Sequence, residues 1–340
     1  MPSVGAPPRP VALCAKAAYQ RRMPHSRSQL DAADAAALIV RVRAGERAAI
    51  ARAATELERL TPAVPALLAA MRPHLGHALV VGFTGPPGAG KSTLVNALIA
   101  HARGLGRTVG VIAVDPSSPI SGGAILGDRV RMTAALDDDG VFVRSLASRG
   151  SLGGLSPAAV RILDVLDAAG KDLILVETVG TGQSEIDIVD VADVRVLTTA
   201  PGLGDDIQAM KAGLIEIADI LVVNKADLPD ARRTRLQLEG ALAMRAHGRQ
   251  AVPVLETVAT TGAGLPALWQ AIASASVPRL AEGTDARRRR RARYLIARAA
   301  ADLIAERIRI GTGDKLDALS DRLLAGELLP GEAARALLER

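Results

Sequence analysis

The spacing of hydrophobic residues changes along the 340-residue chain, and the first stretch with a clear period lies between Gln29 and Ala70. Apolar residues recur there at intervals of three, four or eight positions, and they include Leu38, Val42, Ile50, Ala54 and Leu57. This spacing is typical of helices with one buried face. We therefore expect residues 31–78 to form a helical N-terminal extension.

From Leu79 onward the period shortens, and seven short apolar runs follow one another with helical segments between most of them. Apolar strands that alternate with amphipathic helices predict an α/β fold, with a mostly parallel central sheet that is covered by helices. We expect this domain to span residues 79–280. The runs are LVVGFTG, TVGVIAVD, VFVRSL, DLILVET, VRVLTTA, ILVVNKAD and VPVLETVA.

Two of the intervening helices can be predicted in more detail. One is bounded by Ser156, which suits an N-cap, by Pro157 in the first turn and by Gly170 after the last turn. The other, DDIQAMKAGLIEIAD, places four apolar side chains on one stripe, namely Ile207, Met210, Leu214 and Ile217.

The strands stop after Val277-Pro278, and residues 281–340 have only helical patterns. We expect a C-terminal helical arm, with breaks at GTG (Gly311–Gly313) and at LLPGE (Leu328–Glu332), because glycine and proline interrupt helices. No internal repeat is visible.

Composition excludes several classes of protein. Hydrophobic residues at 49% and charged residues at 23% are ordinary for a globular protein, and no apolar run approaches the roughly 18–20 residues that span a bilayer. The single cysteine, Cys14, cannot form an internal disulfide, so a reducing, cytoplasmic location is expected. The five histidines are scattered singly and do not have the spacing of a zinc or nickel site.

The net charge of +6 comes mainly from the first 30 residues and from the run ARRRRRARY (Ala286–Tyr294). Aromatic residues make up only 1% of the chain, which leaves little to stack on bases, so we expect no nucleic-acid partner. We interpret the arginine run as a solvated helix face or a contact for an acidic partner. Residues 1–30 lack acidic residues and are expected to be a disordered tail. Two alternatives fit the same composition: a transit peptide, or a stretch ahead of Met23 that is included because the start was assigned too far upstream.

A P-loop is the clearest chemical motif. The pattern GxxxxGKS begins at Gly85, follows a predicted strand and opens a predicted helix. Glycines let backbone N–H groups turn toward phosphate oxygens, and the helix N-terminus adds positive potential. Lys91 would reach the β- and γ-phosphates, and Ser92 would offer its hydroxyl to Mg²⁺. The candidate phosphate-binding residues are Gly85, Pro86, Pro87, Gly88, Ala89, Gly90, Lys91, Ser92 and Thr93.

A second motif, VVNKAD, predicts that the base is guanine. The carboxylate of Asp227 can accept hydrogen bonds from N1–H and from the exocyclic amine of guanine, whereas adenine has no donor at these positions. Asn224 belongs to the same motif, and the stem of Lys225 can pack over the base. After a later strand, Val258 and Ala259 stand where GTPases usually have a Ser-Ala loop that contacts the base; a backbone contact would survive this difference.

Acidic residues at strand ends are candidates for a magnesium site. Glu177 ends a predicted strand in LVETVGTGQSE, where it would hold Mg²⁺, and the Gly180 amide could sense the γ-phosphate. Asp115 and Asp128 could each order Mg²⁺ or the attacking water, although a turn or N-cap role suits each of them equally well. Lys211, one helical turn or so into its helix, is either a switch residue or a solvated charge.

Taken together, several segments closely resemble the MeaB/ArgK family of SIMIBI-class GTPases, which are associated with methylmalonyl-CoA mutase. The resemblance runs from about Asp31 to the C-terminus, and its segments are GPPGAGKST, AVDPSSPISGGAILGDRVRM, SRGSLGGLS, LVETVGTGQSE, PGLGDDIQAMKAGLIEIAD and VNKAD. It implies a homodimeric G-protein chaperone that uses GTP and Mg²⁺ to load, protect or reactivate an adenosylcobalamin-dependent acyl-CoA mutase. The helical additions would then serve dimerisation and partner docking. The first 30 residues, Val258 and the arginine run depart from the family pattern.

Two other functions remain open at this point. Older naming in the family suggests a kinase of a periplasmic protein that binds lysine, arginine or ornithine, but no kinase catalytic-loop motif is present. A metallochaperone GTPase for nickel enzymes would share the fold class; the chain has neither a His-rich tail nor a cysteine cluster.

Overall fold

The computed structural model describes residues 31–115, 138–147, 155–178, 187–203, 213–243, 251–311 and 313–338. Seven strands form one sheet, and every pair of neighbouring strands is parallel. The order in the sheet is β3-β2-β4-β1-β5-β6-β7. All seven predicted strands are present: β1 (Leu79–Thr84), β2 (Val109–Asp115), β3 (Val141–Ala147), β4 (Leu173–Glu177), β5 (Val194–Thr199), β6 (Ile220–Val223) and β7 (Val254–Glu256).

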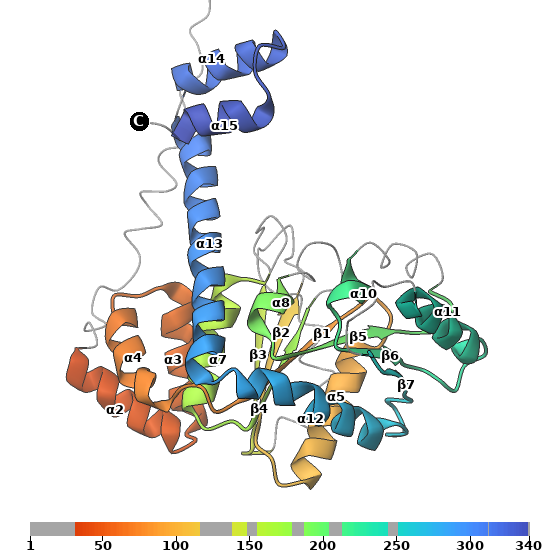
Figure 1. The fold of residues 1–340 in the computed structure, drawn as a ribbon. Helices are drawn as coiled ribbons and strands as arrows, with labels where there is room; N and C mark the ends of the chain where they lie inside the picture. Colours follow the sequence, from red (N-terminus) through yellow and green to blue (C-terminus); the bar gives the residue numbers. More distant parts are fainter. Residues whose placement is uncertain are drawn as a thin grey trace, which may run out of the picture.

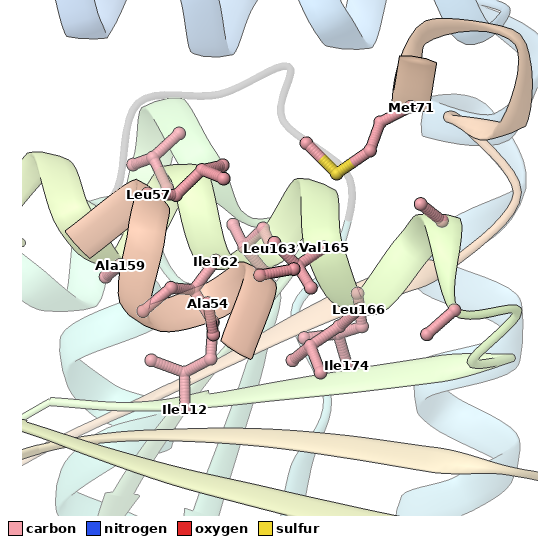
Figure 2. Packing of buried hydrophobic residues seen from close by; sticks show 14 of the residues in the cluster. Ala54, Leu57, Met71, Ile112, Ala159, Ile162, Leu163, Val165, Leu166 and Ile174 are labelled. Carbon is pink, nitrogen blue, oxygen red and sulfur yellow. The ribbon is translucent and has the colours of Figure 1, made fainter. Parts of the chain in front are cut away.

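One face of the sheet is covered by the N-terminal helices together with α7 (Figure 1). Alternate strand residues such as Val80, Ile112 and Ile174 point to this face, as the period of two in a strand requires. Leu57 of α3 and Leu163 of α7 belong to the same core, which Figure 2 shows from close by. The helices on this face are α2 (Ala32–Arg43), α3 (Arg47–Arg59), α4 (Val64–Met71), the 3₁₀ turn η1 (Arg72–His74), α7 (Pro157–Ala168) and the short α8 (Ile188–Val191).

The other face is covered by α5 (Lys91–Gly104) and α12 (Leu265–Ala281), which contact one another. Val81, Val111 and Leu175, which alternate with the residues of the first face, lie in this second core. A third, smaller cluster lies around β6 and includes residues of α10 (Leu214–Ile217) and α11 (Ala231–Ala243). The chain therefore has the predicted fold, a helix-covered parallel sheet with helical extensions.

The N-terminal extension consists of several helices, because its regular apolar spacing hides a break. Gly45, with a φ of +79°, separates α2 from α3. All five residues of the predicted apolar face are nevertheless buried. Asp31 caps α2, and its side chain accepts a hydrogen bond from the Asp34 backbone N–H.

Helix α7 has the predicted ends. Ser156 is the N-cap and its Oγ accepts from the Ala159 N–H at 3.3 Å, Pro157 is in the first turn, and Gly170 follows the helix with a φ of +72°. Of the stripe predicted over DDIQAMKAGLIEIAD, Leu214 and Ile217 lie in α10, whereas Ile207 and Met210 lie outside the described residues.

The C-terminal arm is formed by α13 (Thr284–Gly311), α14 (Gly313–Leu324) and α15 (Pro330–Leu338), so both predicted breaks are present. Figure 1 shows α13 extending away from the sheet, with α14 and α15 at its far end. Residues 1–30 lie outside the described residues.

Of the two interpretations of the arginine run, a solvated face is wrong for Arg287 and Arg291. Arg287 and Arg291 are only 3% and 5% exposed, and with Arg290 they bind the buried carboxylate of Asp193. The Arg287 Nη2–Asp193 Oδ2 distance is 2.8 Å. These arginines have an acidic partner within the chain, because a buried carboxylate requires compensating charge.

Candidate nucleotide-binding site

The predicted site residues gather at one edge of the sheet because parallel strands all end on the same side. Strands β4, β1, β5 and β6 are consecutive neighbours. Glu177 and Thr199 are the last residues of β4 and β5, and the P-loop and Asn224 directly follow β1 and β6. Ligands of open α/β sheets bind beyond these carboxyl ends.

Glycines shape the P-loop for steric as well as conformational reasons. Gly85, Gly88 and Gly90 have φ values of +135°, +80° and +82°. A Cβ on Gly85 would lie 1.9 Å from the Thr198 carbonyl oxygen, and one on Gly90 would lie 2.5 Å from Asn224 Nδ2. A Cβ on Gly88 would meet nothing within 4 Å. The backbone of β5 thus requires a glycine at position 85 and the Asn224 side chain requires one at position 90, whereas Gly88 is required by its backbone angle alone.

Lys91 is the first residue of α5, and its side chain lies against the loop. Its Nζ donates to the carbonyl oxygens of Gly85 at 2.8 Å and Pro86 at 3.1 Å, and the residue is 7% exposed. The ammonium group is therefore already held within the turn of the loop, beside the helix N-terminus that would face phosphate.

Ser92 and Glu177 form a hydrogen-bonded pair of side chains beside the P-loop. Ser92 Oγ donates to Glu177 Oε1 at 2.6 Å. Glu177 is the last residue of β4 and is buried; it shares the strand face of Leu173 and Leu175, which is the face that α5 covers. A hydroxyl and a carboxylate are ligands that a hard divalent cation prefers, so these two residues fit Mg²⁺.

Asn224 joins the P-loop to two other loops. Its Nδ2 donates to the Ala89 carbonyl at 3.0 Å, and its Oδ1 accepts from Thr257 Oγ1 and from the Ala259 N–H, both at 3.2 Å. Asn224 is buried, so these bonds are shielded from water. Sequence reasoning missed Thr257, which follows β7 and belongs to no recognisable motif.

Lys225 adds a second connection between the two motifs. Its backbone is left-handed, with a φ of +56°, and its Nζ donates to the Gly88 carbonyl at 2.9 Å. Asp227 follows two residues later in an exposed turn. The NKAD turn and the P-loop are therefore joined directly by hydrogen bonds from Asn224 and Lys225.

The loop after β7 is closed by its own backbone. The Val258 N–H donates to the Ala263 carbonyl at 3.0 Å, and Gly264, with a φ of +79°, passes so close to Glu256 that a Cβ would lie 2.2 Å from its carbonyl oxygen. The Ala259 N–H is used by Asn224, so the base loop is tied to the NKAD turn without a serine hydroxyl.

Four predicted residues cannot be assigned to this arrangement. Asp115 is the last residue of β2, and the structure describes its backbone only. Asp128, Gly180 and Lys211 lie outside the described residues.

The parallel sheet, the P-loop and the NKAD turn that is hydrogen-bonded to it define a P-loop GTPase that binds guanine nucleotides. The sequence profile "Methylmalonyl Co-A mutase-associated GTPase MeaB" matches residues 50–312, and the chain belongs to this family.

Relatives and a solved structure agree with this assignment. PH0274 of Pyrococcus horikoshii, named as a GTPase, is 46% identical over 308 residues, which cover 89% of this chain and 97% of that protein. The GTPase ArgK of Escherichia coli is 41% identical over 243 residues, with coverages of 69% and 73%. The crystal structure titled LAO/AO transport system kinase superposes with a TM-score of 0.71 at 28% identity, covering 91% of this chain and 98% of that one.

None of the helices in the described ranges is both long and apolar enough to cross a membrane.

Proposed function

We propose that this GTPase is a G-protein chaperone that couples GTP binding and hydrolysis to the loading, protection or reactivation of an adenosylcobalamin-dependent acyl-CoA mutase, in the cytoplasm. The description of its family as methylmalonyl-CoA mutase-associated supports the partner class. The nucleotide part of the proposal depends on one observation, the hydrogen bonds that join Asn224 and Lys225 to the P-loop.

In this proposal residues 85–93 hold the phosphates, and Asp227 selects guanine. Asp227 is exposed and stands two residues after Lys225. Because the Lys225 amine donates to the Gly88 carbonyl, this hydrogen bond keeps the turn that carries Asp227 next to the phosphate loop. Val258 and Ala259 would approach the base through their backbone. Asp227→Asn should shift preference from GTP toward xanthosine triphosphate, since the 2-oxo group of xanthine accepts where guanine donates.

Magnesium would be held by Ser92 and Glu177, whose oxygens lie 2.6 Å apart. Bound there, the ion would neutralise charge on the β- and γ-phosphate oxygens. Glu177 would orient the ion and Lys91 would stabilise the phosphates. Asp115 and Asp128 stay as candidates for further ligands or for ordering the attacking water, Gly180 for sensing the γ-phosphate, and Lys211 for a switch that responds to a partner.

The C-terminal arm is proposed to form a homodimer. Helices α13 to α15 expose many large apolar side chains for an extension of this size, and such surfaces are typical of subunit contacts. They include Ile296, Leu303, Ile304, Ile308, Leu323, Leu324, Leu329 and Leu338. In the same proposal residues 31–78 and 281–340 serve partner docking and dimerisation around a GTPase domain of residues 79–280.

Two measurements test the proposal. Titration with fluorescent GTP and ATP should show a clear preference for GTP, and equal affinities would contradict guanine selection by Asp227. The purified chain should also form a complex with an acyl-CoA mutase in at least one nucleotide state; the absence of a complex with GDP, GTP or a non-hydrolysable analogue would contradict the partner assignment.

A kinase is the second candidate, because the superposed crystal structure is titled a transport system kinase. Transfer of radiolabel from the γ-phosphate of GTP to a substrate-binding protein, instead of to water, would establish it. Release of the label only as inorganic phosphate would leave GTP hydrolysis as the reaction.

A further inference from the structure

Helix α8 lies between the strand that leads to the P-loop and the C-terminal arm. Ile188 and Val191 of α8 are fully buried. Ile188 packs so closely on Gly82 of β1 that a Cβ there would lie 2.3 Å from Ile188 Cδ1. Gly82 stands three residues before Gly85, so α8 contacts the strand that carries the phosphate loop.

On its other side, α8 is held by α13 at its C-terminal end. Arg291 Nε donates to the Val191 carbonyl at 3.0 Å. Asp193, which follows the helix, binds Arg287, Arg290 and Arg291, and its Oδ2 also accepts from the Val80 N–H of β1 at 3.0 Å. These charge-assisted bonds are buried and fix the end of α8 to both the arm and β1.

At the N-terminal end of α8, a tyrosine hydroxyl of α13 makes the contact. Tyr294 OH lies 3.0 Å from Oδ2 of Asp187, the residue before α8, and also hydrogen-bonds to the Leu155 carbonyl. Both partners are acceptors, so one proton is shared between them. Tyr294 is buried, and burial together with the Asp187 carboxylate raises the pKa of its hydroxyl, which therefore stays protonated at neutral pH.

The two partners of Tyr294 come from different segments of the chain. Asp187 follows Glu177 by ten residues in sequence, and Glu177, at the end of β4, accepts a hydrogen bond from the Ser92 hydroxyl. Leu155 is fully buried and precedes Ser156, the N-cap of α7, after the end of β3. One side chain of the arm thus connects the entry to α7 with the entry to α8.

We propose that Tyr294 is a positioning residue for GTP hydrolysis: through Asp187 and Leu155 it fixes α8 against β1, and so couples the C-terminal arm to the nucleotide site. This inference depends on the GTPase class of the chain and not on the mutase partner. Displacement of α13 would move α8, which packs directly on the strand of the P-loop.

The test is Tyr294→Phe, which removes the hydroxyl and keeps the ring. We expect kcat for GTP hydrolysis to fall about 3- to 20-fold, the range of coupling through packed networks. The affinity for GDP should change by less than about twofold, because the P-loop and base contacts that bind both states are retained. Ser276→Ala is the matched control, since it removes a buried hydroxyl that donates to the Ala273 carbonyl within the same helix, α12.

Asp187→Asn, alone and combined with Tyr294→Phe in a double variant, separates coupling from stability. If the hydrogen bond carries the effect, the double variant should lose no more activity than the more impaired single variant. All rates are measured at a temperature where circular dichroism shows each variant folded. Additive losses, an equal fall in kcat for Ser276→Ala, or unchanged kcat in Tyr294→Phe would each overturn the proposal, whatever nucleotide or partner preference the chain shows.

Discussion

At the scale of single residues, the three P-loop glycines are not equivalent. Gly85→Ala would place a methyl group 1.9 Å from a backbone oxygen of β5, which cannot move without distorting the sheet. We expect this variant to lose nucleotide binding by 100-fold or more, on the order of the cost of severe overpacking. Gly88→Ala meets no neighbour and carries only the strain of a left-handed backbone, so about a tenfold loss or less is expected. Equal losses in fluorescent-GDP titrations would contradict the distinction.

Asn224 is the second residue with a measurable individual role. Asn224→Ala removes the bonds to Ala89, Thr257 and the Ala259 N–H, so a buried carbonyl and a buried N–H lose their partner. We expect weaker binding of both GDP and GTP, by about 10- to 100-fold, measured by isothermal titration. Thr257→Val breaks one of these bonds and should cost only about two- to fivefold. A larger loss in the threonine variant would show that Asn224 is not the centre of this network.

Asp164 of α7 gives a stability prediction that does not involve nucleotide. Burial raises the pKa of its carboxyl to about 6, and the positive charge of Arg291 acts in the opposite direction. The unfolded chain releases this proton at about pH 4, so the native state binds more protons between about pH 4 and 6 and its stability falls as pH rises through that window. Asp164→Asn should therefore flatten the dependence and stabilise the protein at pH 8 by about 1–3 kcal/mol.

Urea unfolding at pH 4 and pH 8 measures both quantities for Asp164→Asn. Equal stabilities of wild type and variant at pH 8 would contradict the raised pKa of Asp164.

The predicted residues that the structure brings together belong to short motifs. The P-loop and the NKAD turn carry their signal within a few positions, because phosphate and guanine dictate residue types locally. Thr257, Asp193 and Tyr294 could not be identified, since each acts through a partner far away in the sequence: Asp193 is 94 residues from Arg287. A single buried acid or tyrosine has no local pattern that distinguishes it from a solvated one.

At the scale of elements, the sequence predicted the seven strands but not their order. The apolar period shows which side chains share a face, whereas strand neighbours depend on connections and on long-range packing. The N-terminal helices illustrate the limit in another way. The apolar face crosses Gly45 in one interval of eight residues, from Val42 to Ile50, which a single helix would also allow. Only the backbone of that glycine therefore reveals that two helices share one apolar face.

Two strand glycines allow a matched prediction about α8. Gly82→Ala forces a methyl group against Ile188, and Gly110→Ala forces one against Leu166 of α7 at 2.9 Å. Both should lower the free energy of unfolding, by about 1–3 kcal/mol. Only Gly82→Ala should also slow GTP hydrolysis, because α8 contacts the strand of the P-loop. Equal rates in the two folded variants would show that α8 does not influence the site.

At the scale of the whole molecule, the arm is firmly held near its first residues and apolar toward its tip. Leu324 and Leu329 are 86% and 68% exposed. The double change Leu324→Glu with Leu329→Glu should convert a homodimer to a monomer in light scattering, since unpaired carboxylates are costly to bury in an interface. Leu236→Glu on α11, also exposed, is the control that should leave the dimer intact. A monomeric wild type, or a dimer that survives the double change, would contradict the proposed assembly.

The bond between Asn224 and the Ala89 carbonyl joins residues 135 positions apart, and this separation affects how the protein is synthesised. A nascent chain that has emerged from the ribosome only as far as β5 contains the entire phosphate loop but not the asparagine that secures it. The ability to retain a nucleotide should therefore appear late in translation, once β6 and β7 have emerged, and chains arrested before residue 224 should not bind GTP.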